Sequence, residues 1–400
     1  MSTTRGGFRQ HWWEVVGTFL KIGTLSYGGA ASMGIMQTEV QEKRAWIPKE
    51  QFIEGLALVN TLPGPAGIQL GIFLGYSRAG WWGGVLAGLC FILPAFCILL
   101  SLTLIYHHYG ALPRIRHLFY GLSPVVVGIF AMSVYRLGRA AVRDGKQVLL
   151  AVVAALAVGL TPVGIIPTLL LAGAAGVTLY GSRPWGIVSG LVILVLYNAH
   201  HWGNEWWAMP AFTDTGIDRS GSSLSPGLWD IGLFFLKVGA LSFGGGLTIL
   251  AFIQDQVVHH LHWLTPQQFL DGLALGQLTP GPTLMLAAFV GYAVGSIWGA
   301  MVAAAAVYLP SFILMLSVLP MLEHLRHVAW LKAALQGISP AVIGVTAVAV
   351  LQMVPYALPD LLTGVLAVGT VVALVLWQLS PLLLLTGGAA IGLVLRARLS

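Results

Sequence analysis

Charged residues are scarce in this chain. Lys, Arg, Asp and Glu make up 8% of the 400 residues and hydrophobic residues make up 57%, whereas a soluble globular domain carries about 25% charged residues. The apolar residues lie in runs of membrane-spanning length that follow one another with little interruption. This composition excludes a soluble globular protein. It predicts an all-α polytopic membrane protein whose main partner is the lipid bilayer.

Cysteine is almost absent as well. Cys90 and Cys97 cannot form a disulfide framework, and their place on one apolar segment indicates packing. Residues 1–10 lack the charged-then-apolar pattern of a signal peptide, so we expect the first apolar stretch to be retained. The net charge of +6 comes from Arg and Lys scattered at segment ends. That pattern is typical of membrane-protein loops and argues against nucleic-acid binding.

Motifs for nucleotide hydrolysis and for other enzymatic chemistry are missing. No Gly-x-x-x-x-Gly-Lys-Ser/Thr loop, nucleophile elbow or zinc motif occurs, and no soluble stretch is large enough for an ATPase. The tract His259-His260-x-His262 contains metal-ligand types, but adjacent histidines point different ways and only Asp255 is a nearby carboxylate. We therefore predict no metal, no cofactor and no enzyme, and transport driven by ion gradients or membrane potential.

Two Pro-Gly-Pro sequences interrupt long apolar segments at matching places. Residues 52–65 recur as 269–282, and residues 19–29 recur as 235–245, at an offset of 216 or 217 residues. Two prolines around a glycine end one half-helix and begin another. Within a bilayer, broken backbone is tolerated only where protein or an aqueous cavity satisfies the freed groups. Paired broken segments in the two halves of a chain indicate the binding site of a transporter.

The repeat divides the chain into a first repeat (1–197), a polar linker (198–227) and a second repeat (228–400). Counting apolar segments from the densest basic loop places the linker outside and starts the second repeat from the opposite face, so the repeats are predicted to be inverted. The first two segments of each repeat either cross, giving about 13 spans, or form re-entrant hairpins, giving about 9. The basic loop, which we place in the cytoplasm, contains Arg136, Arg139, Arg143 and Lys146.

We expect the breaks to form the substrate site. Unpaired N–H groups and the helix dipole at a half-helix N-terminus favour an anion, although small residues at a break also serve close helix packing. Inversion would bring four breaks to one site near the midplane. The expected substrate-binding residues at the breaks are Ser26, Gly28, Gly29, Asn60, Thr61, Pro63, Gly64, Pro65, Ser242, Gly244, Gly245, Gln277, Thr279, Pro280, Gly281 and Pro282.

A lysine lies in the first apolar segment of each repeat, within the same Phe-Leu-Lys-x-Gly frame. Lysine near a helix centre costs roughly 2.5–3.5 kcal/mol on insertion. Lys21 and Lys237 either snorkel to an interface or face a cavity and attract an anion, and we include both among the substrate-binding candidates. Carboxylates near the breaks either titrate during transport or sit at an interface. These candidate coupling residues are Glu39, Glu54, Asp255 and Asp271.

These motifs resemble the chromate ion transporter family in its long form with two homologous halves. The resemblance rests on the Phe-Leu-Lys-x-Gly segments with their aromatic-Gly-Gly breaks, the Pro-Gly-Pro segments with Glu54 or Asp271 ahead, and Leu-Pro at 93 and 309. It implies efflux of chromate, chromate resistance, sulfate as a related dianion, and the bacterial inner membrane. The two halves differ at two motif positions. The first half has Tyr27 where the second has Phe243, and it has Asn60 where the second has Gln277.

We therefore predict an inverted-repeat secondary transporter that exports chromate. A negative interior favours outward movement of a dianion by about 4.6 kcal/mol per 100 mV. Uptake or exchange of sulfate or another oxyanion is the first alternative, and uptake would need proton coupling through Glu54 or Asp271. An intramembrane enzyme or scaffold is the second alternative. Homodimer formation is left open.

Overall fold

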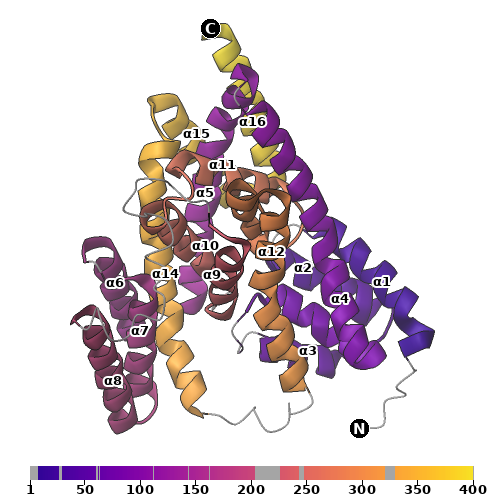
Figure 1. The fold of residues 1–400 in the computed structure, drawn as a ribbon, viewed down its shortest axis with the longest axis vertical. Coiled ribbons are helices and arrows are strands. Elements are labelled where there is room, and N and C mark those ends of the chain that lie inside the picture. Colours follow the sequence, from indigo (N-terminus) through magenta and orange to yellow (C-terminus); the bar gives the residue numbers. More distant parts are fainter. Residues whose placement is uncertain are drawn as a thin grey trace.

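The computed structural model describes residues 8–26, 29–59, 62, 64–110, 112–142, 144–161, 163–202, 226–242, 247–319 and 329–399. These residues are almost entirely helical and form no β-sheet (Figure 1). The first repeat contains α1 (Phe8–Leu25), α2 (Gly29–Met36), the π-helical turn η1 (Gln37–Glu42), α3 (Lys49–Val59), α4 (Ala66–Tyr109), α5 (Pro113–Ala141), α6 (Gly145–Leu160), α7 (Ile165–Tyr180) and α8 (Arg183–Trp202).

The second repeat follows the same order, without a counterpart of α8. It contains α9 (Leu228–Ala240), α10 (Leu247–Gln254), the π-helical turn η2 (Asp255–His260), α11 (Pro266–Leu278), the 3-10 turn η3 (Thr283–Met285), α12 (Leu286–Val318), α14 (Ala329–Ala357), α15 (Leu361–Leu376) and α16 (Pro381–Leu399). Matching helices begin at matching caps. Asp144 at the start of α6 accepts the N–H of Gln147, and Asp360 at the start of α15 accepts the N–H of Thr363, which satisfies free amides of the first turn.

Several helices have the length and composition of membrane spans. Among the described residues these are Ala66–Tyr109, Pro113–Arg139, Thr283–Val318 and Ala333–Ala357, and shorter apolar helices accompany them. Large apolar side chains stay exposed on their outer faces, such as Leu89 on α4 and Ile313 on α12. An apolar surface of this kind suits contact with lipid. The prediction of an all-α polytopic membrane protein is confirmed.

The first segment of the first repeat is a helical hairpin. Lys21 on α1 contacts Glu39 on η1, and Glu14, farther back on α1, contacts Arg44 just beyond η1. These two pairs show that the α2–η1 leg returns antiparallel along α1. In the second repeat, Phe234 on α9 likewise meets residues of both α10 and the loop after η2, namely Phe252 and Trp263.

The Pro-Gly-Pro segments are hairpins too. Gly55 on α3 lies against Phe73 in the first part of α4, and Gly272 on α11 lies against Phe289 in the first part of α12. Both pairs join the leg before the break to the leg after it. The structure therefore favours re-entrant hairpins, and with them the lower estimate of about nine spans.

A kink at matching positions separates each hairpin leg from a long helix. The backbone leaves helical geometry at Ala79–Gly80 in α4 and at Gly295–Ser296 in α12. Gly80 has φ 70°, which glycine adopts at little cost, and Ser296 has φ 55°. The second repeat thus keeps the same kink, with Ser296 in the place of Gly80. Beyond each kink, the rest of α4 or α12 runs on as a spanning helix.

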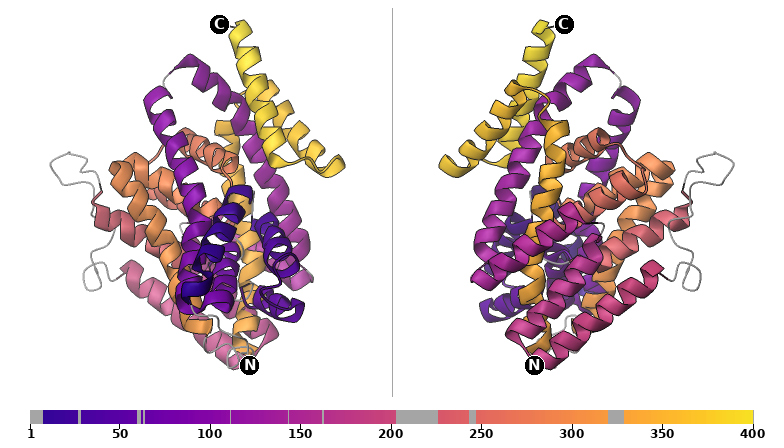
Figure 2. Two further views of the ribbon diagram at one scale, coloured as in Figure 1. Left: turned by 90° about the vertical axis from the view of Figure 1, so that its right-hand side faces the viewer. Right: turned by 90° about the vertical axis from the view of Figure 1, so that its left-hand side faces the viewer.

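Matching helices of the two repeats run in opposite directions. In Figure 1, α4 rises to the top of the molecule and α5 descends from there, whereas α12 descends to the bottom and α14 rises from there. The perpendicular views in Figure 2 show the same opposition for α5 and α14. The inversion expected from the charge pattern is therefore present in the arrangement of the helices.

The two repeats interlock through their later helices. α6 and α7 pack on α14, while α15 and α16 pack on α5. Glycines permit these close approaches, as at Gly176 against Gly337 and Gly121 against Gly388. α8 continues to Trp202, so its last five residues belong to the segment predicted as the linker (198–227). Residues 203–225 lie outside the described residues.

Candidate functional site

Gly64 and Gly281 sit at the centres of the two Pro-Gly-Pro breaks. Their φ angles are +124° and +117°, in a region that side-chain-bearing residues rarely adopt. A Cβ on Gly64 would lie 2.6 Å from Ser311 Oγ and would also clash with Gln69, and a Cβ on Gly281 would lie 2.5 Å from Ala95 Cβ. Both conformation and space therefore require glycine at these positions.

The breaks of one repeat bind the breaks of the other. The N–H of Gly64 donates to the carbonyl oxygen of Ser242, and the N–H of Gly281 donates to that of Ser26, 2.5 Å away. Ser26 directly follows α1, and Ser242 is the second residue after α9, so both lie at the breaks of the first segments. The four breaks therefore meet in two cross-repeat pairs, which form the meeting point of the repeats. The amides of Gly64 and Gly281 are already satisfied there, so they are not the unpaired groups that we expected.

The middle sections of α4 and α12 form the walls around this meeting point. Ala95 of α4 lies against Gly281, and Ser311 of α12 lies against Gly64. Each wall residue directly follows a proline inside its helix, Pro94 or Pro310. Each repeat therefore supplies the wall for the break of the other repeat, in keeping with their inversion.

Buried hydroxyl groups lie at the breaks and on the α12 wall. In the part of the chain that the structure describes, the side-chain oxygens of Ser26, Ser242, Tyr308 and Ser311 are buried without a hydrogen-bond partner. A buried polar group without a partner is unfavourable, and in native proteins it calls for an explanation such as a missing ligand or water. These hydroxyls can donate to an oxyanion.

Other expected break residues take varied positions. Gly29 is the first residue of α2, and Pro65 and Pro280 are buried. Thr279 is buried and its hydroxyl donates to the carbonyl oxygen of Leu275, whereas Gln277 and Pro282 are half-buried. Six expected residues lie outside the described residues: Gly28, Asn60, Thr61, Pro63, Gly244 and Gly245.

Lys21 is held by a carboxylate. Its Nζ lies 3.0 Å from Glu39 Oε2, and Nζ of Lys43 lies 2.7 Å from Glu39 Oε1. The Lys21 side chain is 50% exposed, so this pair joins the legs of the first hairpin at its surface. A direct role for Lys21 in binding an anion stays a prediction. The same holds for Lys237, which is exposed on α9.

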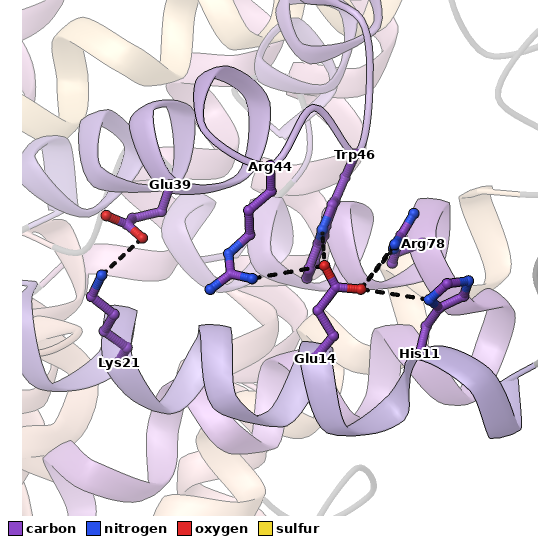
Figure 3. Close-up of polar contacts among 7 residues, drawn as sticks. All are labelled: His11, Glu14, Lys21, Glu39, Arg44, Trp46 and Arg78. Atoms are coloured by element: carbon purple, nitrogen blue, oxygen red, sulfur yellow. Dashed lines mark hydrogen bonds and ion pairs between the residues drawn. The ribbon is translucent and has the colours of Figure 1, made fainter.

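Glu14 is the centre of a second charged group that the sequence did not reveal (Figure 3). It accepts hydrogen bonds from Trp46 Nε1 at 2.8 Å and from Arg78 Nη2 at 2.9 Å, and it also contacts His11 and Arg44. The carboxylate thereby joins α1, the loop after η1 and the end of the hairpin leg of α4. The sequence offered one signal for this charged group, because tryptophans occupy matching positions in the two repeats, at 46 and 263.

The coupling candidates differ between repeats. Asp271 is buried and accepts hydrogen bonds from Tyr106 Oη at 2.7 Å and Gln267 Nε2 at 3.0 Å, whereas Glu54, its counterpart in the first repeat, is exposed. Oδ2 of Asp255 lies 3.5 Å from Nε2 of His260. Among the described residues no group of three His, Cys, Asp or Glu side chains could hold a metal ion.

Asp271 borders a vestibule of about 490 Å³ that is lined by both polar and apolar residues. Its lining comes from α4, α5, α11 and α14 and from neighbouring loops, and it includes Tyr106, Arg116, Tyr120, Gln267, Asp271 and Tyr356. The vestibule therefore lies beside the second-repeat hairpin, on the side from which α11 enters. Arg116 supplies a positive charge there, which suits the approach of an anion.

Comparisons with known proteins identify the family. The model of a family described as chromate transporter matches residues 13–177 and again residues 229–393. A chromate transport protein of Cupriavidus metallidurans is 33% identical over 387 residues, covering 95% of this chain and 92% of the relative. A probable chromate transport protein of Synechococcus elongatus is 33% identical, covering 90% of this chain and 88% of the relative.

A chromate transport protein of Pseudomonas aeruginosa is 29% identical, covering 88% of this chain and 84% of the relative. No solved structure matches this chain. The two family matches correspond to the two inverted repeats, and they contain all four breaks. With both repeats matched and relatives aligned over most of its length, this chain belongs to the chromate transporter family.

Proposed function

We propose that this protein is a secondary transporter that exports chromate across the bacterial inner membrane and thereby confers resistance to it. The observation that carries the proposal is the reciprocal hydrogen bonding of Gly64 to Ser242 and of Gly281 to Ser26. It gathers four interrupted segments of inverted repeats, the arrangement in which transporters hold small ions. The relatives named as chromate transport proteins supply the substrate.

The energetics favour export. A dianion that moves out of the negative cytoplasm gains about 4.6 kcal/mol per 100 mV. With the loop at Arg139 in the cytoplasm, the base of the first-repeat hairpins also faces the cytoplasm. Lys21, Lys43, Arg44 and Arg78 outnumber the carboxylates Glu14 and Glu39 that they contact. This excess of positive charge would raise the local concentration of chromate at the entry side.

The buried breaks represent a closed arrangement. Ser26, Gly64 and Ser242 are all buried, so the substrate can enter or leave only after the hairpins separate. In the proposed cycle, hairpins of one repeat move away from the midplane while those of the other repeat keep it sealed. The vestibule at Asp271 serves as the exit on the periplasmic side.

Reconstitution in proteoliposomes tests the proposal. Labelled chromate and labelled sulfate are loaded separately, and efflux is followed under an imposed diffusion potential of either sign. We expect chromate flux that rises when the compartment it leaves is made negative, and a Gly281→Val protein inserted in parallel should carry none. Absence of flux for every anion and either potential would refute the transporter proposal.

Proton-coupled uptake of sulfate is the second candidate. It is favoured by one observation, the burial of Asp271 beside the vestibule, because a buried carboxylate can carry a proton. The same vesicles distinguish the two. Uptake predicts sulfate accumulation driven by an inwardly directed proton gradient, which chromate export does not require. The proposed partners are accordingly the oxyanion and the lipid bilayer. A homodimer is a further possible partner state, and crosslinking in membranes would detect it.

A further inference from the structure

The two walls around the breaks differ in chemistry, although they occupy equivalent places in the repeat. At the repeat offset of 216 residues, Ile92 and Ala95 of α4 correspond to Tyr308 and Ser311 of α12. Ala95 lies against Gly281 and Ser311 lies against Gly64. The wall from the first repeat is therefore apolar, while the wall from the second repeat carries two hydroxyl groups.

Both hydroxyl groups of α12 are buried and lack partners. Tyr308 is 2% exposed and Ser311 is 1% exposed, and neither side-chain oxygen has a hydrogen-bond partner in the described part of the chain. Residues three apart on a helix share a face, so the two hydroxyls belong to one side of α12. An apolar pair at these places would fold without unsatisfied groups, as Ile92 and Ala95 do in α4.

Ser242 extends this polar surface across the break. Its carbonyl oxygen accepts the N–H of Gly64, and Gly64 in turn lies against Ser311 Oγ. The Ser242 hydroxyl is also buried, without a hydrogen-bond partner among the described residues. Ser242, in the break after α9, and Ser311 of α12 therefore both contact Gly64, and both carry a buried hydroxyl without a described partner.

We propose that Tyr308, Ser311 and Ser242 donate hydrogen bonds to the transported oxyanion, which binds against α12 at the Gly64 break instead of midway between the repeats. This inference rests on the proposed function and adds the residues that hold the substrate. Oxygen atoms of a tetrahedral dianion accept hydrogen bonds from hydroxyl groups, and bonds to charged groups are the stronger kind. The substrate thus supplies the missing acceptor for each hydroxyl.

The proposal separates binding from folding. Tyr308→Phe and Ser311→Ala each remove a hydroxyl group that has no hydrogen-bond partner among the described residues, so neither should lower membrane abundance or the melting temperature. Each should raise KM for chromate about tenfold, the effect of losing one hydrogen bond to a charged group. Thr18→Val is the matched control, because Thr18 has another buried hydroxyl without a partner among the described residues and belongs to α1, about two helical turns before Ser26.

The experiment uses full-length protein in proteoliposomes and measures KM for chromate. A second readout is the rise of melting temperature that chromate causes in detergent, which should shrink in the α12 variants and stay intact in Thr18→Val. Ser242→Ala provides a third position if an α12 variant does not reach the membrane. Wild-type KM and an undiminished chromate-induced shift in the variants would overturn the inference, whereas failure of the wild-type protein to carry chromate would instead refute the proposed function.

Discussion

The N–H of Gly281 donates to the carbonyl oxygen of Ser26 over 2.5 Å, which joins the broken segment of one repeat to that of the other. Gly281 lies so close to Ala95 that a methyl group at Gly281 would approach Ala95 Cβ to 2.5 Å. Its positive φ adds a second restriction, since left-handed backbone costs a residue with a side chain roughly 1–2 kcal/mol. The contact between repeats therefore depends on this glycine.

We predict that Gly281→Ala reduces chromate flux in proteoliposomes more than tenfold. Part of the loss comes from the clash and part from backbone strain. The double variant Gly281→Ala/Ala95→Gly removes the clash and keeps the strain, so it should recover part of the flux. Equal flux of the single and double variants would show that the contact with Ala95 does not matter.

We predict that Glu14 stabilises the first-repeat hairpins. Glu14→Gln removes the charge that holds Arg78 and should lower stability by about 1 kcal/mol, because the pair is only partly buried. Asp230→Asn is the matched control in the second repeat, where the carboxylate only accepts the N–H of Gly227 at the start of its own helix. Melting temperatures in detergent should fall further for Glu14→Gln than for Asp230→Asn.

A double-mutant cycle with Arg78→Gln isolates the interaction. If the ion pair contributes, the double variant should be less destabilised than the sum of the two single changes. Strict additivity would contradict a contribution from this pair. The cycle also distinguishes Arg78 from Arg44, whose distance to Glu14 is longer at 3.7 Å.

The sequence predicted the positions of the breaks but not the partners that meet there. Proline and glycine restrict the backbone locally, so Gly64 and Gly281 could be identified from two short motifs. The contact between Tyr106 and Asp271 joins residues 165 positions apart, and only the packing of α11 between the long helices brings them together. No local pattern contains that information.

The same reason explains the missed hydroxyl wall. Tyr308 and Ser311 drew no attention within an apolar run. Comparing the repeats residue by residue at these positions would have revealed them, since α4 has Ile and Ala there.

We predict that Asp271 determines how transport depends on pH. It faces Tyr106 of α4, and Arg116 and Tyr356 border the same vestibule. Asp271→Asn keeps the size and the acceptor for Tyr106 but cannot take up a proton. Flux measured from about pH 5.5 to about pH 8.5 should vary in the wild type and become flat in this variant. Glu54→Gln is the control, because Glu54 is exposed, and it should leave the profile unchanged.

We predict that Lys21 contributes to the capture of chromate through its charge. Lys21→Gln leaves Glu39 paired with Lys43 and reduces the positive charge at the hairpin base, so KM should rise about two- to fivefold at low ionic strength. Added salt should remove the difference, because it screens exposed charges. Lys21→Arg keeps the charge and should resemble the wild type. A KM increase that persists at high salt would instead indicate direct binding.

We predict opposite sides of the membrane for two loops that occupy different repeats. The loop at Arg139 is basic and should be cytoplasmic, whereas the turn at His259 has no neighbouring Lys or Arg and should be periplasmic. Both residues are exposed, so single cysteines placed there can react with a membrane-impermeant thiol reagent. Intact cells should label position 259 alone, and inverted vesicles should label position 139 alone.

The labelling needs a protein without native thiols, because Cys97 is exposed. Cys90→Ala and Cys97→Ala provide that background, and its chromate flux is the control for intact folding. Arg139 lies in the last turn of α5, and His259 lies beside Tyr356 near the end of α14. Because α5 and α14 run in opposite directions (Figure 2), the two positions should emerge on opposite faces. Labelling of both positions from the same side would therefore contradict the inverted arrangement in the membrane, and labelling of both from the reversed sides would contradict the proposed entry and exit sides.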